Sequence, residues 1–263
     1  MFVTSFSADL FDSVADGYDE KVPFFATFAR QLVAWAEPGP ADSVLDLGTG
    51  RGAVSLAVAE ARGAGEILAV DVSPRMVDSV AALGVAGLRA RVMDAQALDL
   101  PDGSFDLVFS GFAFHILPDP AAALRETARV LRPGGRAVLS VPGPSEDGGW
   151  WAGYGEIVAE FTARLTGDVP PGMADEPWDE VAEQTGLRFT RTSTAEVRLP
   201  VDGPRAHWDW LLSHGNRWLY DALGEADRAE FAERVLASLR DAHPTGGRDV
   251  IAGAEFYELT KVR

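Results

Sequence analysis

Three glycines near residue 50 stand in a pattern that lets a protein bring its backbone close to a nucleotide. The stretch VLDLGTGRGAV, residues 44–54, satisfies the dinucleotide pattern G-x-G-x-x-A from Gly48 to Ala53. The same stretch satisfies D-x-G-x-G-x-G from Asp46 to Gly52. Glycine permits this close approach without a steric penalty, and the first turn of a following helix offers free N–H groups to an anion. The loop alone leaves open whether that anion is the pyrophosphate of NAD or another group.

Acidic residues near the ends of three predicted strands narrow the choice. Asp71 ends the second strand, where a carboxylate can accept hydrogen bonds from ribose hydroxyls. Asp94 and the N–H of Ala95 follow the third strand and can read the edge of an adenine. Asp46, at the end of the first strand, would repel a pyrophosphate but could hold an ammonium group or the N–H groups of the loop. Asp71 suits the ribose of either cofactor, whereas Asp46 and the Asp94–Ala95 pair favour S-adenosylmethionine (SAM), whose methionine carboxylate would be the anion at the loop.

The elements that must position these residues alternate between strand and helix from residue 41 to 142. Short, mostly apolar runs predict five strands, and helical patterns separate them. Runs that are apolar on both faces are typical of a parallel sheet with helices on both sides. Two more strands, RFTRTSTAEVRLPV and DVIAGAEFYELTKV, extend the sheet after residue 142 and predict an antiparallel edge. The five strand segments are SVLDLG, EILAVDVS, LRARVMDA, SFDLVFSG and GGRAVLSVP.

The order of these motifs resembles that of class I SAM-dependent methyltransferases, particularly the small-molecule group related to the ubiquinone/menaquinone C-methyltransferases. The resemblance spans about residues 11–142 and includes SFDLVFSGFAFH and LRPGG at 131–135. It also includes FDSVADGYDE at 11–20, which is similar to the family's amino-terminal F-D-x-x-A-x-x-Y-D signature. The resemblance implies SAM as the cofactor, bound by Tyr18, Asp46, Gly48, Thr49, Gly50, Gly52, Asp71, Val72, Met76, Asp94, Ala95, Ser110 and Phe112.

The resemblance implies an α/β, Rossmann-like class I methyltransferase fold with a seven-stranded, mostly parallel sheet. We expect a helical cap over residues 1–40 and a SAM-binding methyltransferase domain over 41–263. Two insertions, at about 145–180 and 203–245, would form a helical lid. Their places in the chain put them above the carboxyl ends of the strands, where open α/β sheets bind ligands.

Histidines supply the candidate catalytic groups. Methyl transfer from a sulfonium is an in-line displacement, in which the protein aligns the acceptor, excludes water and, for some acceptors, removes a proton. His115 follows the fourth strand, where related enzymes often have a histidine, and it could act as a general base or order the cofactor pocket. His214 is a second candidate base, and His207 lies about two turns before it on nearly the same helical face. The alternative for both is an ordinary packing or surface histidine.

Aromatic residues gather in the predicted lid. Six of the seven tryptophans fall in residues 150–218, together with Tyr154 and Tyr220. Such side chains suit a pocket for a planar or isoprenoid acceptor, but they could equally form the small core of the lid. The expected reaction is methylation of a small molecule, an intermediate of a specialised or isoprenoid pathway. Two alternatives stay open: a SAM-binding sensor or cyclase that does not methylate, and an NAD-dependent reductase.

Composition excludes several other functions. The 263-residue chain has a formal net charge of −17 and no cysteine. The acidity argues against a nucleic-acid partner, because phosphate affinity comes from clustered Lys and Arg. No histidine spacing matches a metal motif, so we expect no metal. No apolar run approaches a membrane span. These features predict a cytoplasmic protein that acts as a monomer or homodimer.

Overall fold

A computed structural model describes residues 2–19, 22–63, 65–166, 178–242 and 248–262. The core is a seven-stranded sheet with the strand order β3-β2-β1-β4-β5-β7-β6. Strand β7 runs antiparallel to its neighbours β5 and β6, and the other pairs are parallel. The prediction of a mostly parallel sheet with an antiparallel edge is therefore confirmed. The strands are β1 (Val44–Leu47), β2 (Ile67–Asp71), β3 (Leu88–Val92), β4 (Phe105–Gly111), β5 (Leu131–Gly143), β6 (Leu187–Val201) and β7 (Arg248–Lys261).

Helices cover both faces of the sheet because its central strands are apolar on both sides. On one face, α2 (Phe24–Ala36) and α3 (Ala53–Arg62) pack side by side and contact strand residues such as Val44. On the other face, α5 (Pro120–Val130) and α7 (Trp178–Thr185) lie over Leu45 and Leu47. Asp46 alternates with these two leucines, so its side chain points to the face of α3. Helix α4 (Pro74–Ala81) lies beside β2 and β3.

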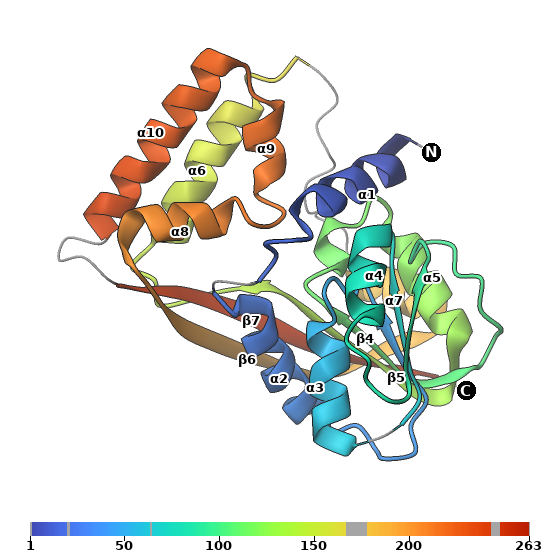
Figure 1. Ribbon diagram of the computed structural model, residues 1–263. Coiled ribbons are helices and arrows are strands. Elements are labelled where there is room, and N and C mark those ends of the chain that lie inside the picture. Colours follow the sequence, from blue (N-terminus) through green and yellow to red (C-terminus); the bar gives the residue numbers. More distant parts are fainter. Residues whose placement is uncertain (1, 20–21, 64, 167–177, 243–247, 263) are drawn as a thin grey trace.

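A further group of helices lies beyond the carboxyl ends of the parallel strands (Figure 1). It consists of α6 (Trp150–Thr162), α8 (Gly203–Leu211), α9 (Arg217–Ala222) and α10 (Glu225–Ala242), and α10 packs against both α6 and α8. Trp208 belongs to the interior of this group, where it contacts Phe231 and Tyr220. Some of the aromatic residues in the insertions therefore form a small helical core.

The two segments of the predicted cap take different positions. Helix α1 (Phe2–Val14) contacts α4, and a small cluster of Val14, Ala15 and Met76 joins the two. Helix α2, by contrast, is an integral layer of the sheet domain, with Phe28, Leu32 and Val33 fully buried. The link between the helices brings Tyr18 and Asp19 over the carboxyl end of β1, close to the glycine loop.

Candidate active site

The glycine loop between β1 and α3 needs glycine for both conformation and space. Gly48, Gly50 and Gly52 have φ values of 68°, 53° and 87°, in the region that L side chains rarely adopt. A Cβ atom on Gly48 would lie 2.4 Å from the Cβ of Ala113, which no packing change in a side chain could relieve. The loop thus brings bare backbone against the segment that follows β4.

Asp46 organises this loop from below. Its Oδ2 accepts hydrogen bonds from the Thr49 hydroxyl at 2.7 Å, and from the amide and hydroxyl of Ser55 at 3.0 and 2.6 Å. Its Oδ1 is buried and has no hydrogen-bond partner among the described residues. Burial raises the pKa of Asp46 to about 6, although the hydrogen bonds from Ser55 and Thr49 oppose that shift. The carboxylate therefore couples the strand end to the first turn of α3.

Asp71 joins the end of β2 to the same loop. Its Oδ2 accepts from the amide of Gly50 at 2.8 Å, and its Oδ1 accepts from the amide of Ser73 at 2.9 Å. Burial raises the pKa of Asp71, and the backbone donors act in the opposite direction. Each oxygen retains a lone pair for a ligand hydroxyl. Asp94, at the end of β3, accepts from the backbone and side-chain amides of Gln96 at 2.9 and 2.8 Å.

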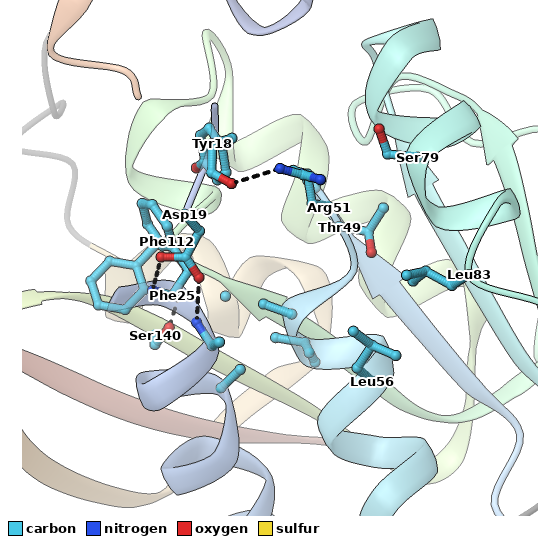
Figure 2. Close-up of a pocket in the computed structure, with 17 residues that line it drawn as sticks. Tyr18, Asp19, Phe25, Thr49, Arg51, Leu56, Ser79, Leu83, Phe112 and Ser140 are labelled. Carbon is cyan, nitrogen blue, oxygen red and sulfur yellow. Dashed lines mark hydrogen bonds between the residues drawn. The ribbon is translucent and has the colours of Figure 1, made fainter. Parts of the chain in front are cut away.

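Two adjoining cavities lie around these residues. The smaller, of about 80 Å³, extends towards β2 and β3, and the larger, of about 320 Å³, lies between the glycine loop and α2 (Figure 2). They share the lining residues Tyr18, Gly48, Gly50, Gly111 and Phe112. Of the predicted cofactor residues, the smaller cavity adds Asp71, Val72, Met76, Asp94 and Ala95, and the larger adds Thr49.

Three predicted cofactor residues line neither cavity. The Ser110 hydroxyl is buried in the sheet and donates to the Leu47 carbonyl at 3.0 Å. Gly52 faces Val80 and Leu83, because a Cβ there would lie 3.2 and 3.3 Å from their side chains. Asp46 lies beneath the loop, as described above. All three support the geometry of residues that do reach the cavities.

Aromatic rings form the wall between the two cavities. The Tyr18 ring stacks on Phe25 with centroids 4.9 Å apart and lies above the loop, so that a Cβ on Gly50 would be 3.7 Å from its Cε1. Phe112 has a φ of 55°, which is uncommon for a residue with a side chain. Its amide donates to the carbonyl and hydroxyl of Ser140 at 3.0 and 3.1 Å, which holds this conformation.

The sequence interpretation missed Asp19 and Arg51, which both line the larger cavity. Asp19 accepts from the amides of Phe25 and Ala26, each at 2.9 Å, and so caps the start of α2. Arg51 donates from Nη1 to the carbonyl of Tyr18 at 3.2 Å. Both stood inside quoted motifs, Asp19 in FDSVADGYDE and Arg51 in the glycine loop. The sequence does not show that the segment with Asp19 and the glycine loop with Arg51 meet at one cavity.

The two candidate bases lie beside the cavities rather than among their lining residues. His115 is in the short 3₁₀ helix Phe114–Ile116, with its ring 6.2 Å from that of Phe112. His214 follows α8, its ring 5.8 Å from Phe25 and 4.8 Å from Trp210. Burial lowers the pKa of each to about 4, so both imidazoles are neutral at physiological pH.

His207 does not share the position of His214. Its ring is buried against Trp150 at 4.8 Å and Trp210 at 5.5 Å, within the aromatic cluster between α6 and α8. Trp210 also contacts Trp151 at 6.1 Å and Phe24 at 5.3 Å. A continuous series of rings therefore runs from the wall between the two cavities to the helices above.

The residues present fit SAM. The glycine loop forms a cradle that a side chain on Gly48 would fill, and Asp71 offers lone pairs to hydroxyl groups beside it. The buried carboxylate of Asp46, close to the loop, disfavours a pyrophosphate, whereas Asp71 stands where NAD and SAM alike would present a ribose. Both carboxylates are compatible with a cofactor that carries positive charge.

Comparisons with known proteins agree with this geometry. A methyltransferase domain family model matches residues 45–139, from β1 into β5. Nocamycin O-methyltransferase of Saccharothrix syringae is 30% identical over 259 residues, which cover 90% of this chain and 92% of that protein. A 2-phytyl-1,4-naphtoquinone methyltransferase of Synechococcus elongatus is 37% identical over 147 residues, 49% of this chain and 60% of that protein. The chain belongs to the class I SAM-dependent methyltransferases, and SAM is its cofactor.

Solved structures share the fold. A Bacillus halodurans protein described as a methyltransferase gives a TM-score of 0.62 at 17% identity, over 90% of this chain and 100% of that one. The [4+2]-cyclase SpnF gives a TM-score of 0.57 at 20% identity, over 90% of this chain and 80% of that one. At these identities the likeness concerns the fold alone.

In the described part of the chain, no three His, Cys, Asp or Glu side chains come together in a group that could hold a metal ion. None of the helices described has the length and apolar character that a membrane crossing requires.

Proposed function

We propose that this protein transfers the methyl group of SAM to an oxygen atom of a small, largely apolar acceptor, an intermediate of specialised metabolism. The observation that carries the proposal is the meeting of Gly50, Asp71 and Phe112 at two adjoining cavities, directly below an aromatic helical cover. When bound, SAM supplies a methyl group already activated on a sulfonium. The protein's own task is alignment of the acceptor and exclusion of water.

The adenosine half of the cofactor is assigned to the smaller cavity. Asp71 would accept from the ribose hydroxyls, and Asp94 with the amide of Ala95 would read the adenine, while Val72 and Met76 form an apolar wall. Tyr18 would close the site from above. Burial, reinforced by Asp71 and Asp19, raises the pKa of its hydroxyl, which stays protonated and can donate a hydrogen bond.

The choice of an oxygen acceptor rests on the relative that matches along nearly the whole chain. Acceptor recognition is expected from the helical cover, so only relatives that align through it bear on the acceptor. Nocamycin O-methyltransferase does so over 90% of this chain, whereas the naphtoquinone methyltransferase matches 49%. This difference favours a specialised metabolite over an isoprenoid quinone. The aromatic series Phe24, Trp210 and Trp151 supports a planar or polycyclic acceptor.

His115 and His214 are proposed to act at the acceptor side. A neutral imidazole can take a proton, but a pKa of about 4 makes it a weak base. Nε2 of His214 lies 3.0 Å from the amide nitrogen of Asn216, which can donate to it and leaves the proton on Nδ1. Nδ1 is buried without a hydrogen-bond partner among the described residues in both His115 and His214, and His115 is the better candidate to meet an acceptor atom because Nε2 of His214 is engaged with Asn216.

Two alternatives predict different ligands or products. An NAD-dependent reductase would bind NADH at the glycine loop, where the buried carboxylate of Asp46 disfavours a pyrophosphate. A sensor or cyclase would bind SAM without forming S-adenosylhomocysteine (SAH). The shared fold with a cyclase does not favour this reading, because the same fold also fits methyltransferases.

Calorimetric titration with SAM, SAH and NADH in parallel tests the cofactor, with Asp71→Ala as the matched variant. Binding of SAM and SAH that the substitution weakens supports the proposal, and binding of NADH alone overturns it. A screen of polycyclic phenols, enols and carboxylic acids with methyl-labelled SAM then tests the acceptor. A labelled ether or ester product supports O-methylation, whereas a labelled C-methyl or N-methyl product contradicts it.

A further inference from the structure

The larger cavity carries an electrostatic pattern that the assigned cofactor residues do not explain. Among its described lining residues, Asp19 and Arg51 are the charged ones, one negative and one positive. Apart from these two, the lining is formed by small or apolar residues and three hydroxyl side chains besides Tyr18, namely Thr49, Ser79 and Ser140. An α-amino acid group carries one positive and one negative charge, and the cavity offers one partner for each.

The larger cavity adjoins the smaller one, so that a cofactor bound in the smaller cavity can extend into it. With the adenosine half beside Asp71, as proposed above, the rest of the cofactor must extend past Tyr18 and Phe112, which line both cavities. That direction leads to Asp19 and Arg51. We propose that these two residues recognise the methionine end of SAM, Arg51 binding its carboxylate and Asp19 its ammonium group. The proposal rests on the assignment of the adenosine half under the proposed function.

Arg51 has donors to spare for a carboxylate. Within the described residues, Arg51 donates from Nη1 to the carbonyls of Asp16 and Tyr18, each at 3.2 Å. A guanidinium carries five N–H donors in a planar fork, which suits a carboxylate. Figure 2 shows the guanidinium directed towards Tyr18, across the top of the cavity. The same side chain thus fastens the segment that carries Tyr18 to the loop beneath it.

The hydrogen bonds that Asp19 accepts at the start of α2 leave further lone pairs on its carboxylate for a ligand. Each oxygen takes one backbone hydrogen bond, from Phe25 and from Ala26, and an ionised carboxylate offers about four lone-pair positions. Its φ of 56° is uncommon for a residue with a side chain, and in this conformation its carboxylate accepts from the amides at the start of α2 while lining the larger cavity. Burial raises the pKa of Asp19 and the charge of Arg51 lowers it, which shows that the two charges interact.

The test uses analogues of the cofactor that lack one group at a time. SAH carries both charges, its decarboxylated analogue lacks the carboxylate, its deaminated analogue lacks the ammonium, and 5′-methylthioadenosine lacks both. Calorimetry measures the affinity of each analogue for wild type, Arg51→Ala, Arg51→Lys and Asp19→Asn. Arg89→Ala is the control, because Arg89 forms an exposed pair with Glu66 and lines neither of the two cavities. Thermal unfolding checks that each variant folds.

Each substitution should lower the affinity only for the analogues that still carry the group that the replaced residue binds. Arg51→Ala should weaken SAH binding by about tenfold or more but leave the decarboxylated analogue and 5′-methylthioadenosine unchanged. Arg51→Lys should restore part of the affinity, because it keeps the charge without the planar fork. Asp19→Asn should weaken SAH by a similar factor and leave the deaminated analogue unchanged. An equal loss for all four compounds would assign both residues to structure alone and overturn the inference, as would no loss.

The same titrations distinguish a wrong cofactor site from a wrong role for Asp19 and Arg51. If wild-type protein binds none of the four adenosyl compounds, the proposed cofactor site is wrong, and the inference falls with it. If wild type binds SAH and the variants fail to distinguish the analogues, the cofactor site stands and only the role of Asp19 and Arg51 is rejected.

Discussion

The carboxylate of Asp71 and the backbone amide of Gly50 lie 2.8 Å apart, although they belong to different strand–helix units. The parallel pairing of β1 and β2 creates this relationship, since Leu47 pairs with Val70 and both strands end at the same edge. The Asp71 side chain therefore fixes the glycine loop and faces the cofactor cavity at the same time. A single substitution should affect both properties.

Asp71→Ala should weaken SAH binding by about tenfold or more, because it removes a ligand acceptor and frees the amides of Gly50 and Ser73. Calorimetry measures the affinity. Asp71→Asn should lose less, since the amide oxygen can still accept from one of these donors. Equal affinity of Asp71→Ala and wild type would contradict the assigned role.

Gly48→Ala should destabilise the protein more than Gly84→Ala does. Both glycines have positive φ, 68° and 64°, and each alanine costs about 1–2 kcal/mol for that conformation. A Cβ on Gly84 meets nothing within 4 Å, whereas one on Gly48 would lie 2.4 Å from the Cβ of Ala113. Urea unfolding measures the difference between the variants. A similar loss of stability at both positions would show that the loop relaxes without cost.

Stability should fall between about pH 4 and pH 6 because of Asp46. Its pKa rises from 3.8 to about 6 on burial, so the folded protein binds this proton more tightly than the unfolded chain. The stabilising effect of the proton is complete below pH 4 and is lost as the pH rises through 6. Asp46→Asn keeps an acceptor for Ser55 and should have a flatter profile of unfolding free energy against pH. Parallel profiles for the two proteins would refute the shift.

Once an acceptor is known, His115→Ala should lower turnover with little change in SAM affinity if the imidazole meets the acceptor. Since burial lowers the pKa of His115 to about 4, wild-type turnover should be insensitive to this group above pH 5 and fall as the pH approaches 4. Turnover against pH, with separate calorimetry of SAM, checks both statements. A loss of SAM affinity would return His115 to the cofactor pocket.

Glu258 gives a stability test far from the glycine loop. Its buried carboxylate lies 2.8 Å from Arg136 and 3.6 Å from Arg191, and it ties β7 to β5 and β6. Glu258→Ala should cost about 2 kcal/mol in unfolding free energy, because it removes the carboxylate partner of the half-buried Arg136, while the more exposed Arg191 contributes little. Glu66→Ala, which breaks an exposed pair with Arg89, should cost under about 1 kcal/mol. Unchanged SAH affinity in both variants would confirm that neither acts at the site.

Local sequence determined the central architecture of this protein. Apolar runs of strand length, glycine stops and the helix-start signal Ser73-Pro74 depend on neighbouring residues, and the structure has a strand or helix at each of these places. The order of the motifs also determined the family and the cofactor, because the glycine loop, which alone also fits NAD, is followed by Asp71, Asp94 and SFDLVFSGFAFH in the order of the methyltransferase family. Asp71, Asp94 and Gly48 could therefore be named from the sequence alone.

Tertiary structure decided which side chains face the cavities. Ser110 and Phe112 are two residues apart in the chain. The Ser110 hydroxyl is nevertheless buried in the sheet, whereas the Phe112 ring lines both cavities, because the chain bends at the end of β4. The assignment of α2 to the sheet layer, and the meeting of Asp19 with Arg51, likewise depend on contacts between distant segments. Sequence spacing carries no record of such contacts, since they arise only when helices pack against the completed sheet.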